Sequence, residues 1–157
     1  MKQQAYDLLR ELEIAYERHE HKAITSVLDL DFTLSGQQVK NLVLKNKKGN
    51  QLYLVILRDE KQANLAQLAE NLGEKRPSFV KEEVLEEILH VPAGTVTPFS
   101  MLFDVEHKIE VVVDADVDQA TTVGFHPFIN STTLNIDFKD FEKILAQTWH
   151  QLRTIAC

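Results

Sequence analysis

The stretch Gln51-Leu52-Tyr53-Leu54-Val55-Ile56-Leu57 decides the fold, because nearly all of it is apolar. A strand with one face in water alternates apolar and polar residues, so this strand is expected to be covered on both faces. The preceding residues 39–45 alternate and are joined to it by the polar turn 46–50, which contains Gly49. The two segments are predicted to form a β-hairpin at the centre of a covered sheet.

Helices and further strands are predicted around this hairpin from the spacing of apolar residues. Helical stripes lie at residues 5–12, 65–72 and 84–89, and a last helix is expected to begin after Asp137, a good N-cap. More strands are expected near residues 14–18, 101–103, 109–114 and 132–136. This order predicts an α/β protein of the α+β type: one domain, 1–157, with a mixed, largely antiparallel central sheet and packed helices.

Composition narrows the class of protein. Of the 157 residues, 44% are hydrophobic and 26% charged, as in a packed globular chain. No apolar run reaches the roughly 18 residues of a membrane span, and no signal peptide is evident. A single cysteine, Cys157, excludes a disulfide framework and a zinc site with two thiolates. We expect a cytoplasmic protein, monomeric because no coiled-coil pattern occurs.

The charge argues against a general nucleic-acid-binding protein, since the net charge is −7 and the pI is near 5.3. Two local basic groups remain, one around the predicted turn and one before residue 82. They are Lys40, Lys45, Lys47 and Lys48, and Lys75, Arg76 and Lys81. Considered by charge alone, they are most simply solvated surface.

Three features do not fit the packing pattern. Lys40 shares a strand face with Leu42 and Leu44, so it either snorkels to the surface or holds an anionic or polarised ligand. Residues 92–99 carry no charge between two prolines, and backbone N–H groups near Gly94 can hold a carbonyl or oxyanion, unless this is an ordinary connector. His126, followed by a proline, is either a ligand-binding or a structural histidine.

Other candidates for chemistry are weaker. His19 and His21 share a strand face, but no third metal ligand can be named. The alternating Asp114, Asp116 and Asp118 lack the glycine and glutamate of a calcium loop. No phosphate-binding loop, nucleophile elbow or dinucleotide fingerprint is present, and Cys157, at an expected frayed terminus, is a poor nucleophile. No cofactor and no metal are expected.

In combination, the three features resemble one family. Lys40-Asn41-Leu42-Val43-Leu44, Gly94-Thr95-Val96-Thr97-Pro98 and Gly124-Phe125-His126-Pro127 are similar, in order and separation, to motifs of the YbaK / prolyl-tRNA synthetase-associated editing-domain family. The branch most similar to this chain is that of the alanyl-tRNA(Pro) deacylases, the ProX-type proteins. The resemblance covers nearly the whole chain. Residues 128–130 are more apolar here than in the family, which bears on pocket size.

The resemblance implies trans-editing: hydrolysis of alanine wrongly attached to tRNA(Pro), without a protein nucleophile or cofactor. A pocket cannot strongly reject an amino acid smaller than its own, so a second site is needed to remove it. Lys40, Gly94 and His126 are then the catalytic residues, and backbone amides of the loop hold the ester carbonyl while a water attacks. The implied substrate-binding residues are Thr25, Asn41, Thr95, Val96, Thr97, Pro98, Gly124 and Phe125. The implied tRNA-binding residues are Lys45, Lys47, Lys48, Lys75 and Arg76.

Alternatives stay open within and outside this class. The preferred substrate could be Cys-tRNA(Pro) or another small misacylated tRNA. The chain could instead be a non-catalytic module that binds tRNA or docks on prolyl-tRNA synthetase, or, with least support, an unrelated small-molecule hydrolase. Asn41 lies on the strand face opposite Lys40 if the strand is regular.

Overall fold

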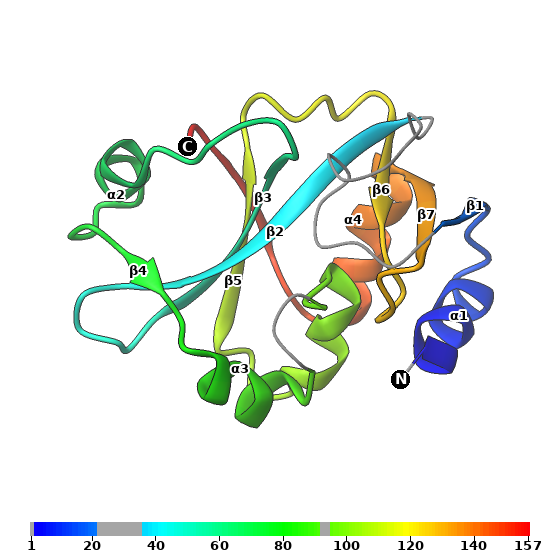
Figure 1. Ribbon diagram of the computed structural model, residues 1–157, viewed down its shortest axis with the longest axis horizontal. Coiled ribbons are helices and arrows are strands. Elements are labelled where there is room, and N and C mark those ends of the chain that lie inside the picture. The colour runs from blue at the N-terminus through cyan, green and yellow to red at the C-terminus, as the bar shows by residue number, and fades with distance from the viewer. Residues whose placement is uncertain (1, 22–35, 92–94) are drawn as a thin grey trace.

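A mixed sheet runs through the computed structural model, which describes residues 2–21, 36–91 and 95–157 (Figure 1). In the described part its order is β1-β7-β6-β2-β3-β5-β8, and β4 pairs with β2. Four pairings are antiparallel (β1·β7, β6·β7, β2·β3, β2·β4) and three are parallel (β2·β6, β3·β5, β5·β8). The strands are β1 (Tyr16–Glu20), β2 (Gln37–Lys45), β3 (Leu52–Arg58), β4 (Ser78–Phe79), β5 (Ile109–Asp114), β6 (Thr122–Phe125), β7 (Thr132–Asp137) and β8 (Leu152–Ile155).

Helices cover both faces of this sheet, so the predicted fold class is confirmed. The helices are α1 (Lys2–Glu11), α2 (Leu65–Leu72), α3 (Glu82–Leu89), α4 (Phe138–Gln147) and the 3₁₀ helix η2 (Pro98–Phe103). Buried side chains of α1, α3, η2 and α4 join one core cluster, and Leu68 of α2 joins a second. No helix within the described ranges is long and apolar enough to cross a membrane.

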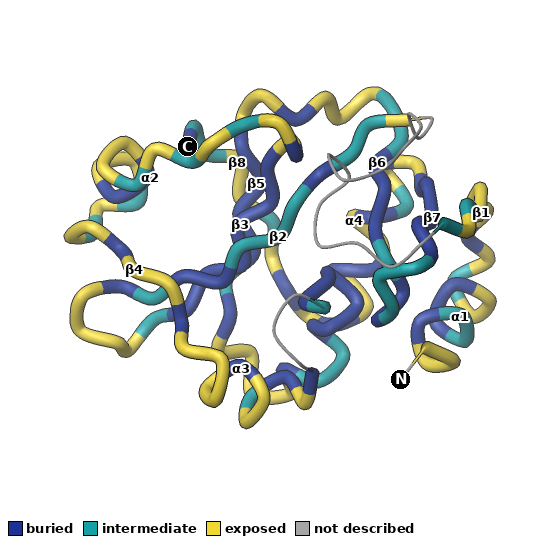
Figure 2. The backbone as a smooth tube through the Cα atoms, viewed as in Figure 1, coloured by how far each residue is buried: buried dark blue, intermediate teal, exposed yellow. Residues whose placement is uncertain are grey.

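The central hairpin is formed as predicted. β2 and β3 pair antiparallel from Val39↔Arg58 to Lys45↔Leu52. In β3, Leu54 and Ile56 face the larger cluster, whereas Val55 and Leu57 face the smaller one. Figure 2 shows β3 and β5 as buried tube segments between exposed helices and turns. Burying both faces of β3 therefore places the hairpin between the two cores.

The sequence prediction was wrong at several elements. Residues 101–103 are not a strand but the end of η2, because Pro98 begins a 3₁₀ turn in which the Thr97 N–H donates to Ser100 Oγ at 3.1 Å. The strand expected near residues 14–18 lies at Tyr16–Glu20, and β4, β6 and β8 were not predicted. Asp137 occupies the N-cap position of α4 but makes no side-chain cap hydrogen bond.

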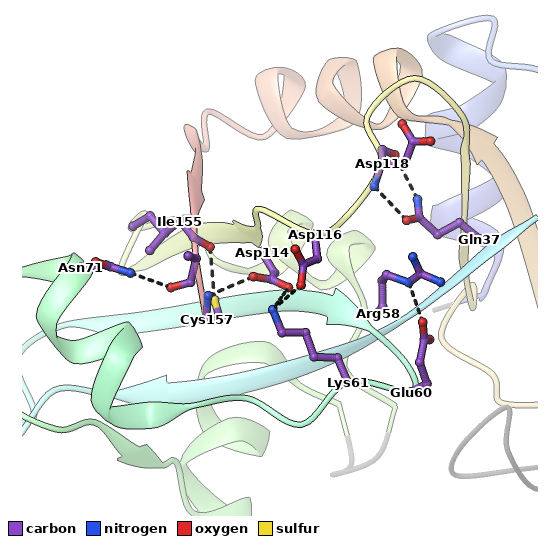
Figure 3. A network of polar contacts seen from close by, with 11 residues as sticks. Gln37, Arg58, Glu60, Lys61, Asn71, Asp114, Asp116, Asp118, Ile155 and Cys157 are labelled. Atoms are coloured by element: carbon purple, nitrogen blue, oxygen red, sulfur yellow. Dashed lines mark hydrogen bonds and ion pairs between the residues drawn. The ribbon is translucent and has the colours of Figure 1, made fainter.

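The acidic loop after β5 is satisfied by protein groups (Figure 3). Asp114 accepts hydrogen bonds from the Lys61 ammonium at 2.6 Å and from the Cys157 N–H at 2.9 Å. Asp116 accepts from the same ammonium at 2.8 Å, and Asp118 accepts from the Ala120 N–H at 2.8 Å. No group of three potential metal ligands occurs among residues 2–21, 36–91 and 95–157.

Cys157 is not frayed, contrary to the expectation. Its side chain is buried, and burial, followed by the charge of Asp114, raises its pKa to about 11. A thiol with so high a pKa carries almost no thiolate at neutral pH. The structure thus supports the prediction that this cysteine is no nucleophile.

Candidate active site

β2 and β6 stop pairing after two residue pairs, and the segments around this opening in the sheet carry the described residues of the predicted site. The two strands pair in parallel only at Gln37↔Val123 and Gln38↔Gly124, and they then diverge (Figure 1). Beyond that point β6 ends at Phe125, whereas β2 continues to Lys45 along β3. Residues 95–97 lead into η2 and meet the chain just after β6, where Val96 contacts His126. The opening is therefore bordered by three segments: β2, residues 95–97, and the end of β6 with His126.

His126 presents a neutral ring at this opening. Burial lowers its pKa to about 4, against the opposing effect of a hydrogen bond with the Val96 backbone. That bond favours the protonated ring, as expected when a carbonyl accepts from a ring N–H. Nδ1 is buried and has no partner among the described residues, so Nε2 is the donor to Val96. At neutral pH the ring thus holds a free acceptor, Nδ1, in a fixed orientation.

A second unpartnered polar atom comes from another border of the opening. Asn41 Oδ1 in β2 is buried and finds no hydrogen-bond partner within the described ranges. A buried polar atom without a partner costs about 1–3 kcal/mol, so most such atoms in proteins are satisfied. Asn41 Oδ1 and His126 Nδ1 are therefore the groups that a polar substrate is best placed to satisfy. Thr97 Oγ1 faces the Ser100 backbone in a capping box at the start of η2.

Lys40 lies on the face of β2 that the sequence predicted. It shares this face with Leu42 and Leu44, which belong to or pack against the smaller core cluster, whereas Val39 and Val43 belong to the larger one. Lys40 lines a cavity of about 390 Å³ between β2, β4 and the start of α2. Asn41 points to the opposite face, because β2 alternates regularly. β2 thus presents Lys40 and Asn41 on opposite sides.

Two residues of the predicted site lie outside the described ranges. Gly94, the proposed centre of the oxyanion site, and Thr25 both fall there. Their roles stay predictions. Among the neighbours of Gly94, Thr95 and Val96 are described, and Thr97 and Pro98 are buried at the start of η2.

Gly124 and Phe125 hold β6 in place. A Cβ on Gly124 would lie 2.5 Å from Gln38 Oε1 and 2.9 Å from Asn135 Oδ1, so only glycine leaves room for both amides. The Gln38 Nε2 donates to Asn135 Oδ1 at 3.3 Å. The Phe125 ring packs on Phe141 with centroids 4.9 Å apart, inside the larger core cluster. The contribution of Phe125 seen in the structure is packing.

Gln38 and Asn135 are polar residues beside the site that the sequence analysis did not single out. Both carried a signal: Gln38 lies two residues before Lys40 on the same strand face, and Asn135 is a polar residue between the apolar Leu134 and Ile136. Asn135 is almost fully buried. The Gln38 and Asn135 amides lie close to Gly124 and so fix β6, which ends directly before His126.

The two basic groups of the sequence are brought together by β4. β4 pairs with the end of β2 at Leu44↔Phe79 and Lys45↔Ser78. The turn with Lys47 and Lys48 therefore lies beside the segment with Lys75 and Arg76. All four of these cations are exposed, and none forms an ion pair with a carboxylate of the described residues. They form a local positive surface on an acidic protein.

The comparisons with known proteins place this chain among tRNA-editing proteins. The chain belongs to the aminoacyl-tRNA editing domain family, whose model matches residues 21–144. It is similar to the prolyl-tRNA editing protein ProX of Acetoanaerobium sticklandii, with 32% identity over 157 residues, which cover 98% of this chain and 96% of the relative. The family predicted from the three motifs is therefore confirmed.

Other known proteins are similar to this chain in sequence or in fold. Prolyl-tRNA synthetase associated domain-containing protein 1 of Danio rerio is 30% identical over 96% of this chain and 84% of its own. The multifunctional Ser/Thr-tRNA deacylase ProXp-y of Escherichia coli K12 is 33% identical, over 60% of this chain and 57% of its own. A crystal structure described as a candidate trans-editing enzyme for prolyl tRNA synthetase superposes with a TM-score of 0.68 at 18% identity, covering 99% and 96% of the chains.

Proposed function

We propose that this protein is a trans-editing hydrolase that removes alanine from mischarged Ala-tRNA(Pro), acting on tRNA charged by prolyl-tRNA synthetase. The observation that carries the proposal is the neutral, oriented ring of His126, whose Nδ1 has no partner among the described residues and lies beside the opening between β2 and β6. Family membership and the similarity to the ProX relative support the choice of substrate. No cofactor is needed for this reaction.

The reaction is hydrolysis of the ester between the amino acid and the terminal ribose. Water adds to the ester carbonyl carbon, the carbonyl oxygen becomes an oxyanion, and the bond to the ribose oxygen then breaks as that oxygen takes a proton. Backbone N–H groups at and around Gly94 stabilise the oxyanion. The Thr97 N–H is already donated to Ser100 Oγ at 3.1 Å, so these donors come from earlier in the loop.

His126 and Lys40 orient the substrate in this mechanism. His126 Nδ1 accepts a hydrogen bond from the attacking water or from a ribose hydroxyl, which a neutral imidazole can do and an imidazolium cannot. Lys40 binds phosphate or ribose oxygens of the terminal adenosine as a compact cation. Asn41 Oδ1, on the opposite face of β2, is available to the amino-acid end, whose α-amino group is a donor. Selection is by size, since proline is excluded from a pocket that admits alanine.

The test is to incubate the protein with tRNA(Pro) charged with alanine, cysteine, serine, threonine or proline. We expect release of alanine and retention of proline, measured as loss of acid-precipitable radiolabelled amino acid. Faster release of cysteine, serine or threonine would assign a different small substrate, a possibility raised by the Ser/Thr-tRNA deacylase relative. No release from any of them would favour a non-catalytic module that binds tRNA or its synthetase.

Salt should weaken the reaction in proportion to the few phosphates that the positive surface neutralises. For two or three phosphates, kcat/KM should fall by about 10- to 40-fold between 50 and 200 mM salt. Changing Lys47 and Lys48 to glutamine should raise KM and flatten this dependence. The matched control is Lys139→Gln with Lys143→Gln on α4, which removes the same charge elsewhere. An unchanged salt dependence in the first variant would remove the turn from the tRNA-binding surface.

A further inference from the structure

More than one cationic side chain lines the cavity beside Lys40. The cavity is lined by residues of β2, β4, α2 and the segment before α2, on the side of β2 away from Asn41. Lys40 and Arg76 both line it, and none of the described residues lining it is acidic. α2 begins at its rim, where Asn64 caps the helix by accepting from the Gln67 N–H at 3.1 Å. The helix dipole therefore adds to the positive potential of the two side chains.

An exposed aromatic ring completes the cavity. Phe79 lines it and is 59% exposed, which is unusual for so large an apolar side chain. Its backbone position is fixed, because Phe79 pairs with Leu44 in the β2·β4 ladder. An exposed aromatic ring beside two cations is the combination with which proteins bind single-stranded nucleic acid, through base stacking and phosphate contacts.

We propose that this cavity binds the nucleotide that precedes the terminal adenosine of the tRNA. Its base stacks on Phe79, its own phosphate lies beside Arg76, and Lys40 contacts the phosphate that joins it to the terminal adenosine. The proposal rests on the proposed function. Lys40 connects the opening with the cavity, because it lies on β2, which borders the opening, and its side chain lines the cavity. About 390 Å³ is at the small end of ligand sites and fits one nucleotide rather than a duplex. The 3′ end is therefore bound unstacked.

A truncated substrate distinguishes the contribution of this cavity from that of the catalytic site. Phe79→Ala and Arg76→Gln should each lower kcat/KM on Ala-tRNA(Pro), by about 5- to 150-fold for the lost stacking contact. On 2′(3′)-O-alanyl-adenosine, which has no preceding nucleotide, both variants should match the wild type. Trp149→Ala, an exposed aromatic after α4, and Arg10→Gln on α1 are the controls and should change neither rate. Phe79→Leu keeps apolar bulk without a planar ring and should behave as Phe79→Ala.

Binding of an uncharged oligonucleotide gives a readout that does not need catalysis. A labelled single-stranded ACCA oligonucleotide should bind the wild type at least 5-fold more tightly than Phe79→Ala, and a blunt RNA hairpin should not compete. Equal binding by the two proteins, or an equal loss of activity on the tRNA and on alanyl-adenosine, would overturn the proposal. If the wild type released no amino acid from any tRNA, the proposed function would fail. Binding of the oligonucleotide would still show whether the cavity holds a nucleotide.

Discussion

Replacing Asp104 with alanine should lower the free energy of unfolding by about 3–5 kcal/mol, because it leaves the buried groups His150 Nε2 and Ile109 N–H without their acceptor, at about 1–3 kcal/mol each. Asp104 Oδ2 lies 2.8 Å from His150 Nε2, and both side chains are 1% exposed. The carboxylate also accepts from the N–H groups of Lys108 at 3.0 Å and Ile109 at 2.9 Å. One side chain thus joins the end of η2, the start of β5 and the chain between α4 and β8. Urea denaturation of the two proteins at pH 7 measures the loss.

The matched variant is Asp104→Asn, which keeps the shape and one acceptor but removes the charge. We expect a smaller loss of about 1–2 kcal/mol, the ordinary difference between charged and neutral hydrogen bonds. Burial alone would raise the pKa of Asp104, but hydrogen bonds from His150, Ile109 and Lys108 hold it below its usual value. The carboxylate therefore stabilises the fold above about pH 4, and this contribution is lost as pH falls through the lowered pKa. An advantage of the wild type over Asp104→Asn that persisted undiminished at pH 2 would contradict the assignment.

The sequence predicted those elements whose packing is periodic. β3 was recognised because apolar residues occupy both faces, and α2 because Leu68 and Ala69 lie on one stripe that became buried. Short elements carried no such signal. β4 has only two residues, Ser78 and Phe79, and exists because β2 offers an edge there. Its formation is a tertiary effect that local spacing does not contain.

The buried Asp104–His150 pair could not be predicted either. The two residues are separated by three strands and a helix, and nothing near either residue indicates that they meet. His150 is positioned by the end of α4, where its N–H donates to Leu145 O at 2.9 Å and Trp149 adopts a φ of 62°. This is a Schellman ending with a tryptophan in the position that glycine usually occupies. Helix endings of this kind are set by the chain that follows.

The site residues stay predictions, although the structure shows where the described ones lie. Lys40 and His126 were singled out because a lysine on an apolar face and a histidine before proline depart from packing patterns. Their separation across β2 could not be found, because it depends on where β2 and β6 stop pairing. The positive surface required β4 to bring Lys47 and Arg76 near each other, although the sequence separates them by 28 intervening residues.

Replacing His126 with alanine should lower kcat/KM for Ala-tRNA(Pro) by about 10²-fold, the size of loss expected when a reacting group is no longer held in position. The physical reason is the loss of Nδ1, a buried acceptor held in place by the Val96 carbonyl. His126→Gln is the sharper variant, because its amide can still donate to that carbonyl but offers no acceptor at the Nδ1 position. It should fold normally and be nearly as inactive as His126→Ala. Single-turnover deacylation at pH 7 measures both.

The pH dependence of activity and of stability tests whether the His126 ring is neutral near pH 7. Since burial lowers the pKa of His126 to about 4, the ring is neutral throughout the range from pH 6 to 8, and its titration should leave no step in activity there. The unfolded chain, with a histidine pKa near 6.5, binds the proton first as pH falls, so the fold loses stability between about pH 6.5 and 4. We expect the wild type to lose on the order of 1–2 kcal/mol between pH 7 and 5, beyond any loss in His126→Gln. A step in wild-type activity near pH 6.5 that is missing from His126→Gln would show that the ring titrates normally, and Nδ1 would then not be the protected acceptor that the mechanism requires.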